Sequence, residues 1–380
     1  MILMTNVNDL MYFFTSYLGI NPAHGCNSGC GYCILEKDNP NPTKIVKSST
    51  AKFTLEMILK SDKVSKINPI TFYNQSDPFL KQNIPDLMHI IEGMEKNNYQ
   101  NPLILITKLN PDKTDQAVLK EISQLKNLKP VIMVTYANVP KKVEPVSKSG
   151  RIELMARSKE LGIPVVQYAR PLWEKWTPFD KVQEMVSETA DKVDSVIVGG
   201  LVVSNEIKAK LKRKNVVIPS WDNDKGRFLN SNYRKRIINE YKRVNPDLGI
   251  FVNSSCGISA ALKVPNYMGY QVGFKRSYNQ DNCSRPCSAK QKEICYFGEP
   301  PIKSYDPEEN RVKFNEENAK VINWLKKFDV EKAMYRIKDG HLNIFARLNT
   351  EEIRMMRQHT GMYIYCDRNF KNIKNKEDII

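Results

Sequence analysis

The sequence contains few histidines and no long apolar run. Only four of its 380 residues are histidine, and His89, His341 and His359 stand alone, which is more typical of packing or surface residues than of metal ligands. No stretch of 18 apolar residues exists, so no membrane span is expected. The first residues lack a basic leader and include several polar side chains. We therefore expect no signal peptide and a cytoplasmic location.

Acidic residues are also scarce relative to basic ones. The chain has 42 Asp and Glu against 58 Lys and Arg, for a net charge of +16. Such a balance favours polyanionic partners, nucleic acid above all. A generally lysine-rich proteome would produce the same charge without such a partner, and charge alone supports only non-specific binding.

Cysteine, by contrast, is present and clustered. Eight cysteines occur in a chain whose 41% hydrophobic and 26% charged content is typical of a globular protein. Cys26, Cys30 and Cys33 form a C-x3-C-x2-C run with Tyr32 before the last cysteine. Three thiolates on one loop can hold three irons of a [4Fe–4S] cluster and leave the fourth iron open for a ligand. The alternatives are a zinc site, for which only His24 lies nearby as a fourth ligand, or three unrelated cysteines.

Strand-like and helix-like segments alternate through the first half of the chain. Buried strands are predicted at 69–73, 103–107, 131–135, 165–169 and 195–199, and helices at 84–97, 115–125, 149–161 and 179–193. With the cysteine loop after a first strand, this pattern predicts six βα units in an α/β fold, with a parallel sheet and helices outside it. Functional loops of such folds gather at the carboxyl ends of the strands.

The cysteine run resembles the signature of the radical SAM superfamily. Four further elements resemble, in order, the spore photoproduct lyase-like (DNA repair photolyase-like) branch: Asn21-Pro-Ala-His-Gly25 before Cys26, Asn74-Gln-Ser-Asp-Pro-Phe79, Glu144-Pro145 with Arg151 and 161–165, and Arg170-Pro-Leu172. The resemblance covers roughly residues 17–201. It implies a partial (β/α)6 barrel, here with a cysteine-rich C-terminal extension. It also implies an open iron that binds S-adenosylmethionine, which is cleaved to methionine and a hydrogen-abstracting 5'-deoxyadenosyl radical.

The resemblance and ligand chemistry together suggest the contacts to S-adenosylmethionine. Its ammonium is expected at Asp77 or Ser76, with Asn74 and Gln75 as neutral alternatives, and its carboxylate at Arg151 or Arg170. Thr135 is expected to bind a ribose hydroxyl, and Tyr32 to cover the adenine. Each residue has a structural alternative: Asp77 shapes the turn before Pro78, Arg151 lies on a helix surface, and Thr135 packs within its strand.

A second cysteine group, Cys256, Cys283, Cys287 and Cys295, lies in one irregular segment. Four thiols in about 40 loop-rich residues suit an auxiliary iron–sulfur cluster or a structural zinc site. Alternatively, one or more of them binds no metal, and Cys256, just after an expected strand at 249–253, would then donate a hydrogen atom in catalysis. Cys366 is expected to be a small core residue.

These features divide the chain into four parts. They are a radical SAM core at 1–203, basic helices and a last strand at 204–255, the cysteine-rich auxiliary site at 256–300, and an α+β extension at 301–380. Within the second part, helices are expected at 205–214 and 233–243, and their basic faces are either solvated or in contact with phosphates.

The expected function is therefore radical chemistry on a substrate, with nucleic acid repair or modification as the first hypothesis. The alternatives are a peptide- or protein-modifying enzyme that uses the second cluster, and a non-catalytic iron–sulfur binding module. An external one-electron reductant such as flavodoxin or ferredoxin would be required.

Overall fold

The computed structural model describes residues 10–14, 16–37, 43–66, 68–111, 117–216, 227–264, 266, 287–297, 322–328, 330, 335–338, 341–344, 346, 348–360 and 363–366. The chain forms two compact units. The first comprises residues 1–12, 18–262 and 285–288, and the second comprises residues 13–17, 263–284 and 289–380.

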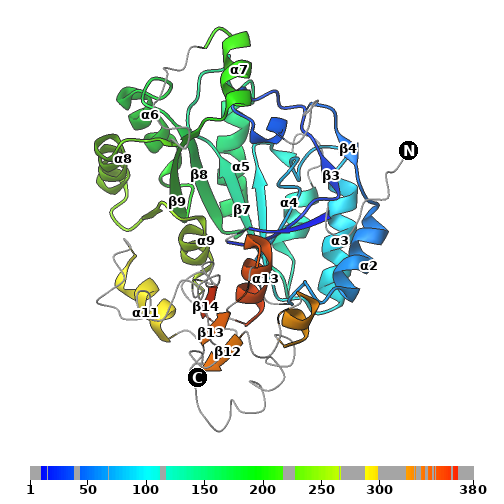
Figure 1. The fold of residues 1–380 in the computed structure, drawn as a ribbon. Helices are drawn as coiled ribbons and strands as arrows, with labels where there is room; N and C mark the ends of the chain where they lie inside the picture. The colour runs from blue at the N-terminus through cyan, green and yellow to red at the C-terminus, as the bar shows by residue number, and fades with distance from the viewer. Residues whose placement is uncertain are drawn as a thin grey trace. The chain divides into compact units, whose positions relative to one another are not determined.

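Six consecutive parallel strands form the centre of the first unit (Figure 1). They are β2 (Leu18–Ile20), β5 (Ile70–Phe72), β6 (Pro102–Thr107), β7 (Lys129–Thr135), β8 (Val165–Leu172) and β9 (Ser195–Val202). Their apolar runs are buried, as expected for parallel strands covered on both faces. The predicted α/β class and its six parallel units are confirmed.

Three more strands lie at the edges of this sheet. β1 (Met11–Phe13) lies beside β2, while β10 (Arg227–Phe228) and β11 (Gly249–Phe251) both pair with β9. β10 is antiparallel to the end of β9, and β11 is parallel to its start. Within the described residues the sheet therefore has nine strands rather than six.

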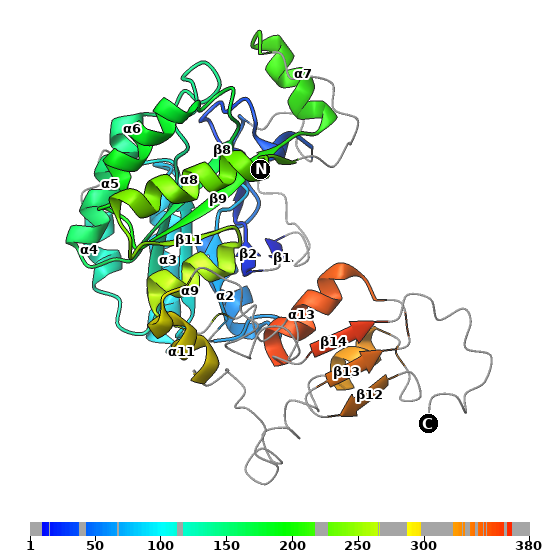
Figure 2. The ribbon, with the colours of Figure 1, turned by 90° about the vertical axis from the view of Figure 1, so that its left-hand side faces the viewer.

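The helices between the strands follow the sequence signals closely. They are α2 (Ala51–Lys60), α3 (Ile84–Lys96), α4 (Ala117–Ser123), α5 (Lys148–Glu160) and α6 (Phe179–Thr189). Ser147 caps α5 by accepting a hydrogen bond from the Gly150 N–H at 3.1 Å, and Gly162 follows the helix with a φ of 76°. Figure 2 shows α4, α5 and α6 together on one side of the sheet.

Hydrogen bonds identify the outer face of the sheet. The Gln167 side chain on β8 accepts hydrogen bonds from Thr189 of α6 at 2.8 Å and from Tyr241 of α8 (Ser231–Val244) at 2.7 Å. Because side chains alternate along a strand, Tyr168 and Arg170 point to the opposite, inner face. Gly199 of β9 shares that face, since a Cβ on it would lie 3.1 Å from the Arg170 side chain.

Helix α9 (Ser254–Leu262) covers the inner face near the amino-terminal ends of the strands. Ser195 at the start of β9 donates a hydrogen bond to the Gly257 carbonyl at 2.7 Å. A Cβ on Gly257 would lie 2.5 Å from Ile197, so only glycine allows this approach.

Burial along the strands shows which end of the inner face is accessible. Near the amino ends the inner-face residues are at most 1% exposed, as at Ile104, Met133 and Ile197. Farther along, Ile106, Tyr168, Arg170 and Gly199 are half-buried. The inner face is thus closed at one end and open at the carboxyl end.

The first unit extends beyond the predicted core boundary at residue 203. Helix α7 (Asn205–Arg213), helix α8, strand β11 and helix α9 all belong to it. The boundary falls at Leu262, because β11 pairs with β9 and α9 packs on the sheet.

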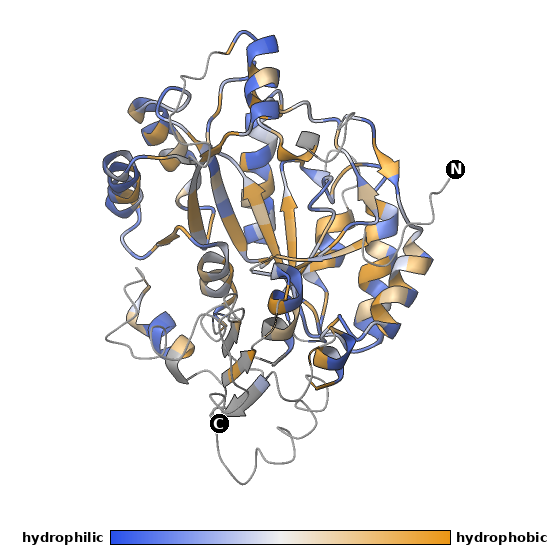
Figure 3. Ribbon diagram, viewed as in Figure 1, coloured by the Kyte–Doolittle hydropathy of each residue, from blue (hydrophilic) through white to orange (hydrophobic). Residues whose placement is uncertain are grey.

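In the second unit, β12 (Tyr335–Lys338), β13 (His341–Ile344) and β14 (Tyr363–Cys366) form a small mixed sheet. The second unit also contains α11 (Ala289–Phe297) and α13 (Thr350–Thr360). The rings of Trp324 and His359 meet edge to face, with 4.8 Å between their centres. Hydrophobic colour follows the strands of the large sheet in Figure 3, and none of the described helices is long and apolar enough to cross a membrane.

Candidate functional site

The three clustered cysteines lie on a loop that follows β2 and the short strand β3 (Ala23–His24). β3 pairs with β4 (Val46–Lys47), which holds the start of the loop in place. The loop turns sharply at Gly25 and Gly29, whose φ angles of 91° and 64° favour glycine. It lies at the carboxyl end of β2, as the sequence predicted.

One side of the loop is bound to the loop after β5. The Gly25 N–H donates to the Gln75 carbonyl at 2.9 Å, and Ser76 Oγ donates to the Gly25 carbonyl at 2.6 Å. The Gln75 N–H in turn donates to Asn21 Oδ1 at 3.0 Å. Residues 74–76, predicted from the sequence as cofactor contacts, therefore adjoin the cysteine loop.

The other side is bound to the loop after β7 and to α7. The Gly31 N–H donates to the Val143 carbonyl at 2.7 Å, and Lys214 Nζ donates to the Gly29 carbonyl at 2.9 Å. A Cβ on Gly31 would lie 3.0 Å from Leu211 of α7, so the helix packs directly on the loop.

The thiols are close enough to influence one another electrostatically. Burial raises the pKa of Cys30 to about 11, and the charges of Cys33 and Cys26 also raise it, while Lys108 lowers it. Burial likewise raises the pKa of Cys26. Both thiols must therefore lose a proton before they bind iron.

No group of three or more His, Cys, Asp or Glu side chains lies within metal-binding distance in the described part of the chain. The donor set nevertheless fits a cluster: three thiols on one short loop, with a loop backbone already fixed by hydrogen bonds on both sides.

Asp77 is buried at the end of the neighbouring loop. Its carboxylate accepts from Thr107 Oγ1 at 2.7 Å, from the Lys108 N–H at 2.9 Å and from the Phe79 N–H at 3.0 Å. Burial raises the pKa of Asp77, and these hydrogen bonds oppose the shift. The geometry thus gives Asp77 the turn-shaping role that was its structural alternative, while its contact with a cofactor stays a prediction.

Lys108 is a second cation beside the cysteine loop, in addition to Lys214. It follows β6, and its Nζ lies 5.4 Å from the centre of the Tyr32 ring. Its charge lowers the pKa of both Cys26 and Cys30. Sequence reasoning missed this residue, because a single lysine after a strand carries no motif; its place directly after a predicted strand was the available signal.

Two buried polar atoms near the loop have no hydrogen-bond partner among the described residues. They are Oδ1 of Asn74 and the hydroxyl of Tyr32. An unpaired buried acceptor or donor is costly, so both atoms fit a site whose ligand supplies the missing bonds. Asn74 and Tyr32 were both predicted as contacts to S-adenosylmethionine, whose ammonium and purine offer donors and acceptors.

Arg151 is buried and does not lie on a helix surface. Its guanidinium forms an ion pair with Glu144, and the two side chains are 3% and 1% exposed. Burial raises the pKa of Glu144, and the charge of Arg151 opposes that shift. Arg151 also donates to the Thr135 carbonyl at 3.2 Å, so it links β7 to the 143–146 loop rather than lying on a helix surface. A direct contact to a cofactor carboxylate stays a prediction.

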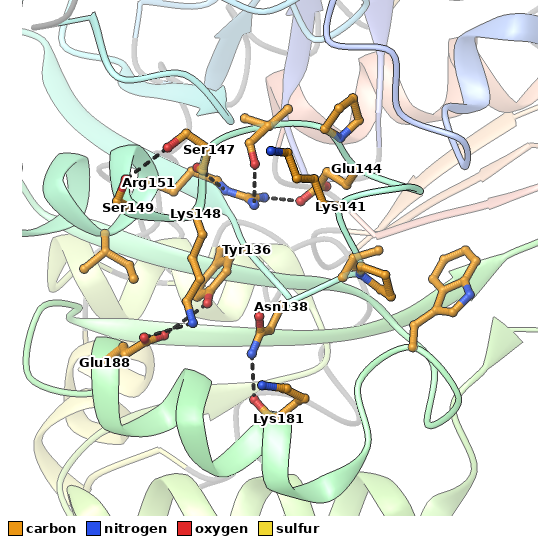
Figure 4. Close-up of a pocket in the computed structure, with 16 residues that line it drawn as sticks. Tyr136, Asn138, Lys141, Glu144, Ser147, Lys148, Ser149, Arg151, Lys181 and Glu188 are labelled. Atoms are coloured by element: carbon orange, nitrogen blue, oxygen red, sulfur yellow. Dashed lines mark hydrogen bonds and ion pairs between the residues drawn. The ribbon is translucent and has the colours of Figure 1, made fainter. Parts of the chain in front are cut away.

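A pocket of 860 Å³ lies on the outer side of the 143–146 loop. Tyr136, Glu144, Lys148 and Glu188 line it (Figure 4). Lys148 forms ion pairs with Glu184 and Glu188 of α6. The pocket therefore adjoins helices α5 and α6 and lies outside the inner face of the sheet.

Arg170 lies on the open part of the inner face. Its Nη1 donates to the Tyr168 hydroxyl at 2.7 Å, and its guanidinium lies 5.7 Å from the centre of the Tyr168 ring. Trp176, on the loop after β8, lies 6.3 Å from Tyr32 between ring centres. Tyr32 thus has both Lys108 and Trp176 as neighbours.

The second cysteine group is divided between the two units. Cys256 is buried in α9 and Cys287 also belongs to the first unit, whereas Cys295 lies in α11 of the second. Cys283 lies outside the described residues. Gly257, next to Cys256, packs against Ser195 at the start of β9. Ser195 and Gly199 are about 13 Å apart along this strand, since each residue adds ~3.3 Å. A role of Cys256 as a catalytic hydrogen donor stays a prediction.

No protein-family model and no curated protein matches this sequence. Its fold is similar to that of spore photoproduct lyase. One mutant structure of that enzyme matches with a TM-score of 0.50 and 13% identity, over 63% of this chain and 78% of the other.

Two further solved structures are similar to this chain. A second mutant of spore photoproduct lyase, with bound S-adenosylmethionine and dinucleoside spore photoproduct, gives a TM-score of 0.49 at 14% identity over 63% of this chain and 78% of the other. SuiB from Streptococcus suis, bound to its precursor peptide SuiA, gives 0.43 at 13% identity over 66% and 52%. The likeness to the mutant with a TM-score of 0.50, at 13% identity, supports the fold alone, a partial α/β barrel.

Proposed function

We propose that this chain is a radical SAM enzyme that binds a [4Fe–4S] cluster through Cys26, Cys30 and Cys33 and acts on a nucleic acid substrate. The observation that carries the proposal is the position of the cysteine loop. Hydrogen bonds fix it between the loops that follow β5 and β7, at the open carboxyl end of the inner face. The fold shared with spore photoproduct lyase supports it.

When bound, the cluster supplies the reductive cleavage of S-adenosylmethionine, which in this family leads to hydrogen abstraction from the substrate. The chain's own residues bind and orient the cofactor. Lys108, whose charge acts on both Cys26 and Cys30, pairs with the carboxylate of S-adenosylmethionine. The unpaired Oδ1 of Asn74 accepts from its ammonium, and Tyr32 covers the adenine.

The ion pair of Arg151 and Glu144 acts indirectly. It fixes the 143–146 loop, whose Val143 carbonyl holds Gly31 at 2.7 Å. We therefore assign Arg151 as a positioning residue, and Thr135, 7% exposed at the end of β7, as the contact to the ribose.

The substrate is argued from the inner face. Arg170 is half-buried there, and within the described part of the chain its guanidinium donates to the Tyr168 hydroxyl alone, which leaves donors in a fork that matches phosphate. Lys108 and the net charge of +16 add to the positive field. A phosphate-bearing substrate, hence nucleic acid, fits these cations. A carboxylate-bearing peptide is the alternative that the experiment below must separate.

The first experiment measures iron, sulfide and zinc after anaerobic reconstitution, together with deoxyadenosine release under dithionite. It compares the wild type with the triple variant Cys26→Ala, Cys30→Ala, Cys33→Ala, and with Cys366→Ala as a matched cysteine control. About four irons lost only in the triple variant, with deoxyadenosine release abolished, supports the proposal. Equal release from the triple variant contradicts it, and a cluster without any release would favour the non-catalytic binding module.

The same preparations address the second cysteine group and the substrate. About eight irons in the wild type and about four in the triple variant would support an auxiliary cluster. About four irons in the wild type and none in the triple variant, with zinc bound to both, would support a structural zinc site. Salt-dependent binding to DNA or RNA that Arg170→Gln weakens would support nucleic acid; no binding at low salt would favour the peptide alternative.

A further inference from the structure

An apolar side chain is exposed immediately beside the cysteine loop. Ile34 follows Cys33 directly, begins the short helix η1 (Ile34–Lys37) and is 61% exposed, more than any other exposed large hydrophobic side chain among the described residues. A single exposed isoleucine is ordinary by itself. Its position next to a predicted cluster ligand is what gives it meaning.

Helix α7 lies beside η1 and packs on the same loop, as Figures 1 and 2 both show. Its apolar side chains Ile207 and Leu211 are buried. Leu211 packs so closely on Gly31 that a Cβ at that residue would lie 3.0 Å from it. Lys214 at its end is bonded to the Gly29 carbonyl at 2.9 Å. The backbone of the cysteine loop is thus in direct contact with α7.

The outward side of α7 is strongly basic. The segment from 205 to 214 contains one acidic residue, Glu206, and five basic ones: Lys208, Lys210, Lys212, Arg213 and Lys214, of which Lys214 faces the cysteine loop. Lys212 and Arg213 are exposed. On the other side of the loop, Lys141 and Lys142 are also exposed and directly precede Val143, which binds Gly31.

We propose that Ile34 and the basic side of α7 form the docking surface for an acidic one-electron carrier protein of the flavodoxin or ferredoxin type. This inference rests on the proposed function, which requires an external electron. The carrier would give one electron to the oxidised cluster held by the cysteine loop and would itself be oxidised by one electron. Protein interfaces commonly have an apolar centre and a charged rim, and the interfaces of electron-transfer complexes are small.

Two observations favour a carrier protein over nucleic acid on this surface. Electron transfer slows steeply with distance, and η1 and α7 touch the cysteine loop itself. Nucleic acid grooves combine cations with aromatic platforms, but the segment from 205 to 214 contains no aromatic residue. Complementary charge would steer an acidic carrier to the loop and raise its association rate.

The test uses a reduced flavodoxin as electron donor and dithionite as a small donor that needs no docking. The double variant Lys212→Glu, Arg213→Glu is compared with wild type and with the charge-matched control Arg234→Glu, Lys235→Glu on α8. Cluster reduction is followed by absorbance, and binding of labelled flavodoxin is measured separately by fluorescence anisotropy on metal-free and reconstituted protein. Ile34→Ser is measured in the same assays.

We expect the α7 variant to slow reduction by flavodoxin about 10-fold or more at low salt and to weaken flavodoxin binding. Its reduction by dithionite should equal that of the wild type, and the α8 control should leave all rates unchanged. Ile34→Ser should weaken flavodoxin binding at both low and high salt. If the α7 and α8 variants lost the same amount of flavodoxin affinity and reduction rate, the effect would come from net charge alone and the inference would be wrong.

Other outcomes separate the two proposals. If the α7 variant lost affinity for an oligonucleotide but kept its affinity for flavodoxin, the surface would be a nucleic acid face and the inference would be wrong. If the wild type released no deoxyadenosine even with dithionite, the proposed function would fail, whatever the anisotropy assay showed about docking.

Discussion

Ser76 Oγ donates a hydrogen bond to the Gly25 carbonyl at 2.6 Å and accepts one from Asn83 at 3.1 Å. Through this one hydroxyl, the start of the cysteine loop is connected to the beginning of α3. The two residues are 51 positions apart in the chain. The loop that carries Cys26 therefore takes its shape from the segment after β5.

Replacing Ser76 with alanine should loosen the cysteine loop. The variant leaves the Gly25 carbonyl without its donor, and we expect a loss of about 1–3 kcal/mol in the free energy of unfolding, together with slower iron incorporation. Urea unfolding and the rate of cluster reconstitution measure the two effects. Ser123→Ala removes an exposed local hydrogen bond and should change neither.

Lys108 should control the affinity for S-adenosylmethionine. A charge-assisted hydrogen bond contributes about 1.5–3 kcal/mol, so Lys108→Met should weaken binding by about 10- to 100-fold, with part of the affinity restored in Lys108→Arg. Equilibrium dialysis with the reconstituted protein gives the dissociation constants, and Lys120→Met on α4 is the control. Unchanged affinity in Lys108→Met would remove this residue from the site.

The buried pair of Glu144 and Arg151 should show an asymmetric response to substitution. Glu144→Gln leaves a buried guanidinium without its counter-charge, and we expect a loss of about 3–5 kcal/mol in the free energy of unfolding. Replacing both residues with methionine removes both charges and should recover much of that loss. Denaturant unfolding of the three proteins decides; a double variant less stable than Glu144→Gln would contradict the account.

Glu184 should make a small pH-dependent contribution to stability. Hydrogen bonds from Lys148 and then Lys181 lower the pKa of Glu184 to about 2 from its ordinary value of 4.5. Because the folded-state pKa lies below the unfolded one, the stabilisation is present above about pH 4.5 and is lost as the pH falls toward 2.

Since Glu184 is partly exposed, its contribution should be about 1 kcal/mol or less. The stability difference between wild type and Glu184→Gln should therefore be present at about pH 6 and shrink by about pH 3. Urea unfolding at both pH values measures it, and a difference that grows as the pH falls would contradict the assignment.

The regular elements could be predicted because their signals are local. The apolar run at 103–107 predicted β6, and the helix expected at 149–161 matches α5 to within two residues. Helix α9 was not predicted, because Ser254–Leu262 is short and mostly buried and has no contrast between polar and apolar sides. Its position on the inner face follows only from packing at Gly257.

The candidate site was predictable only in part, for a similar reason. The spacing of the three cysteines is visible in the sequence, but the partners of their loop are not: Val143 and Lys214 are more than 100 residues away from it. Arg151 was considered as a ligand or as a surface residue, yet it pairs with Glu144, only seven residues earlier. Burial, which rules out the surface alternative, is a property of the folded chain.

The closure of the inner face by α9 limits how a long polymer could reach the cysteine loop. Because Gly257 packs against Ser195 and Ile197, a nucleic acid chain cannot pass along the inner face of the sheet and leave at the amino-terminal ends of the strands. A nucleic acid substrate would have to present a chain end, or a single nucleotide turned out of its stack, at the open carboxyl end. Its product would then have to leave by the same opening.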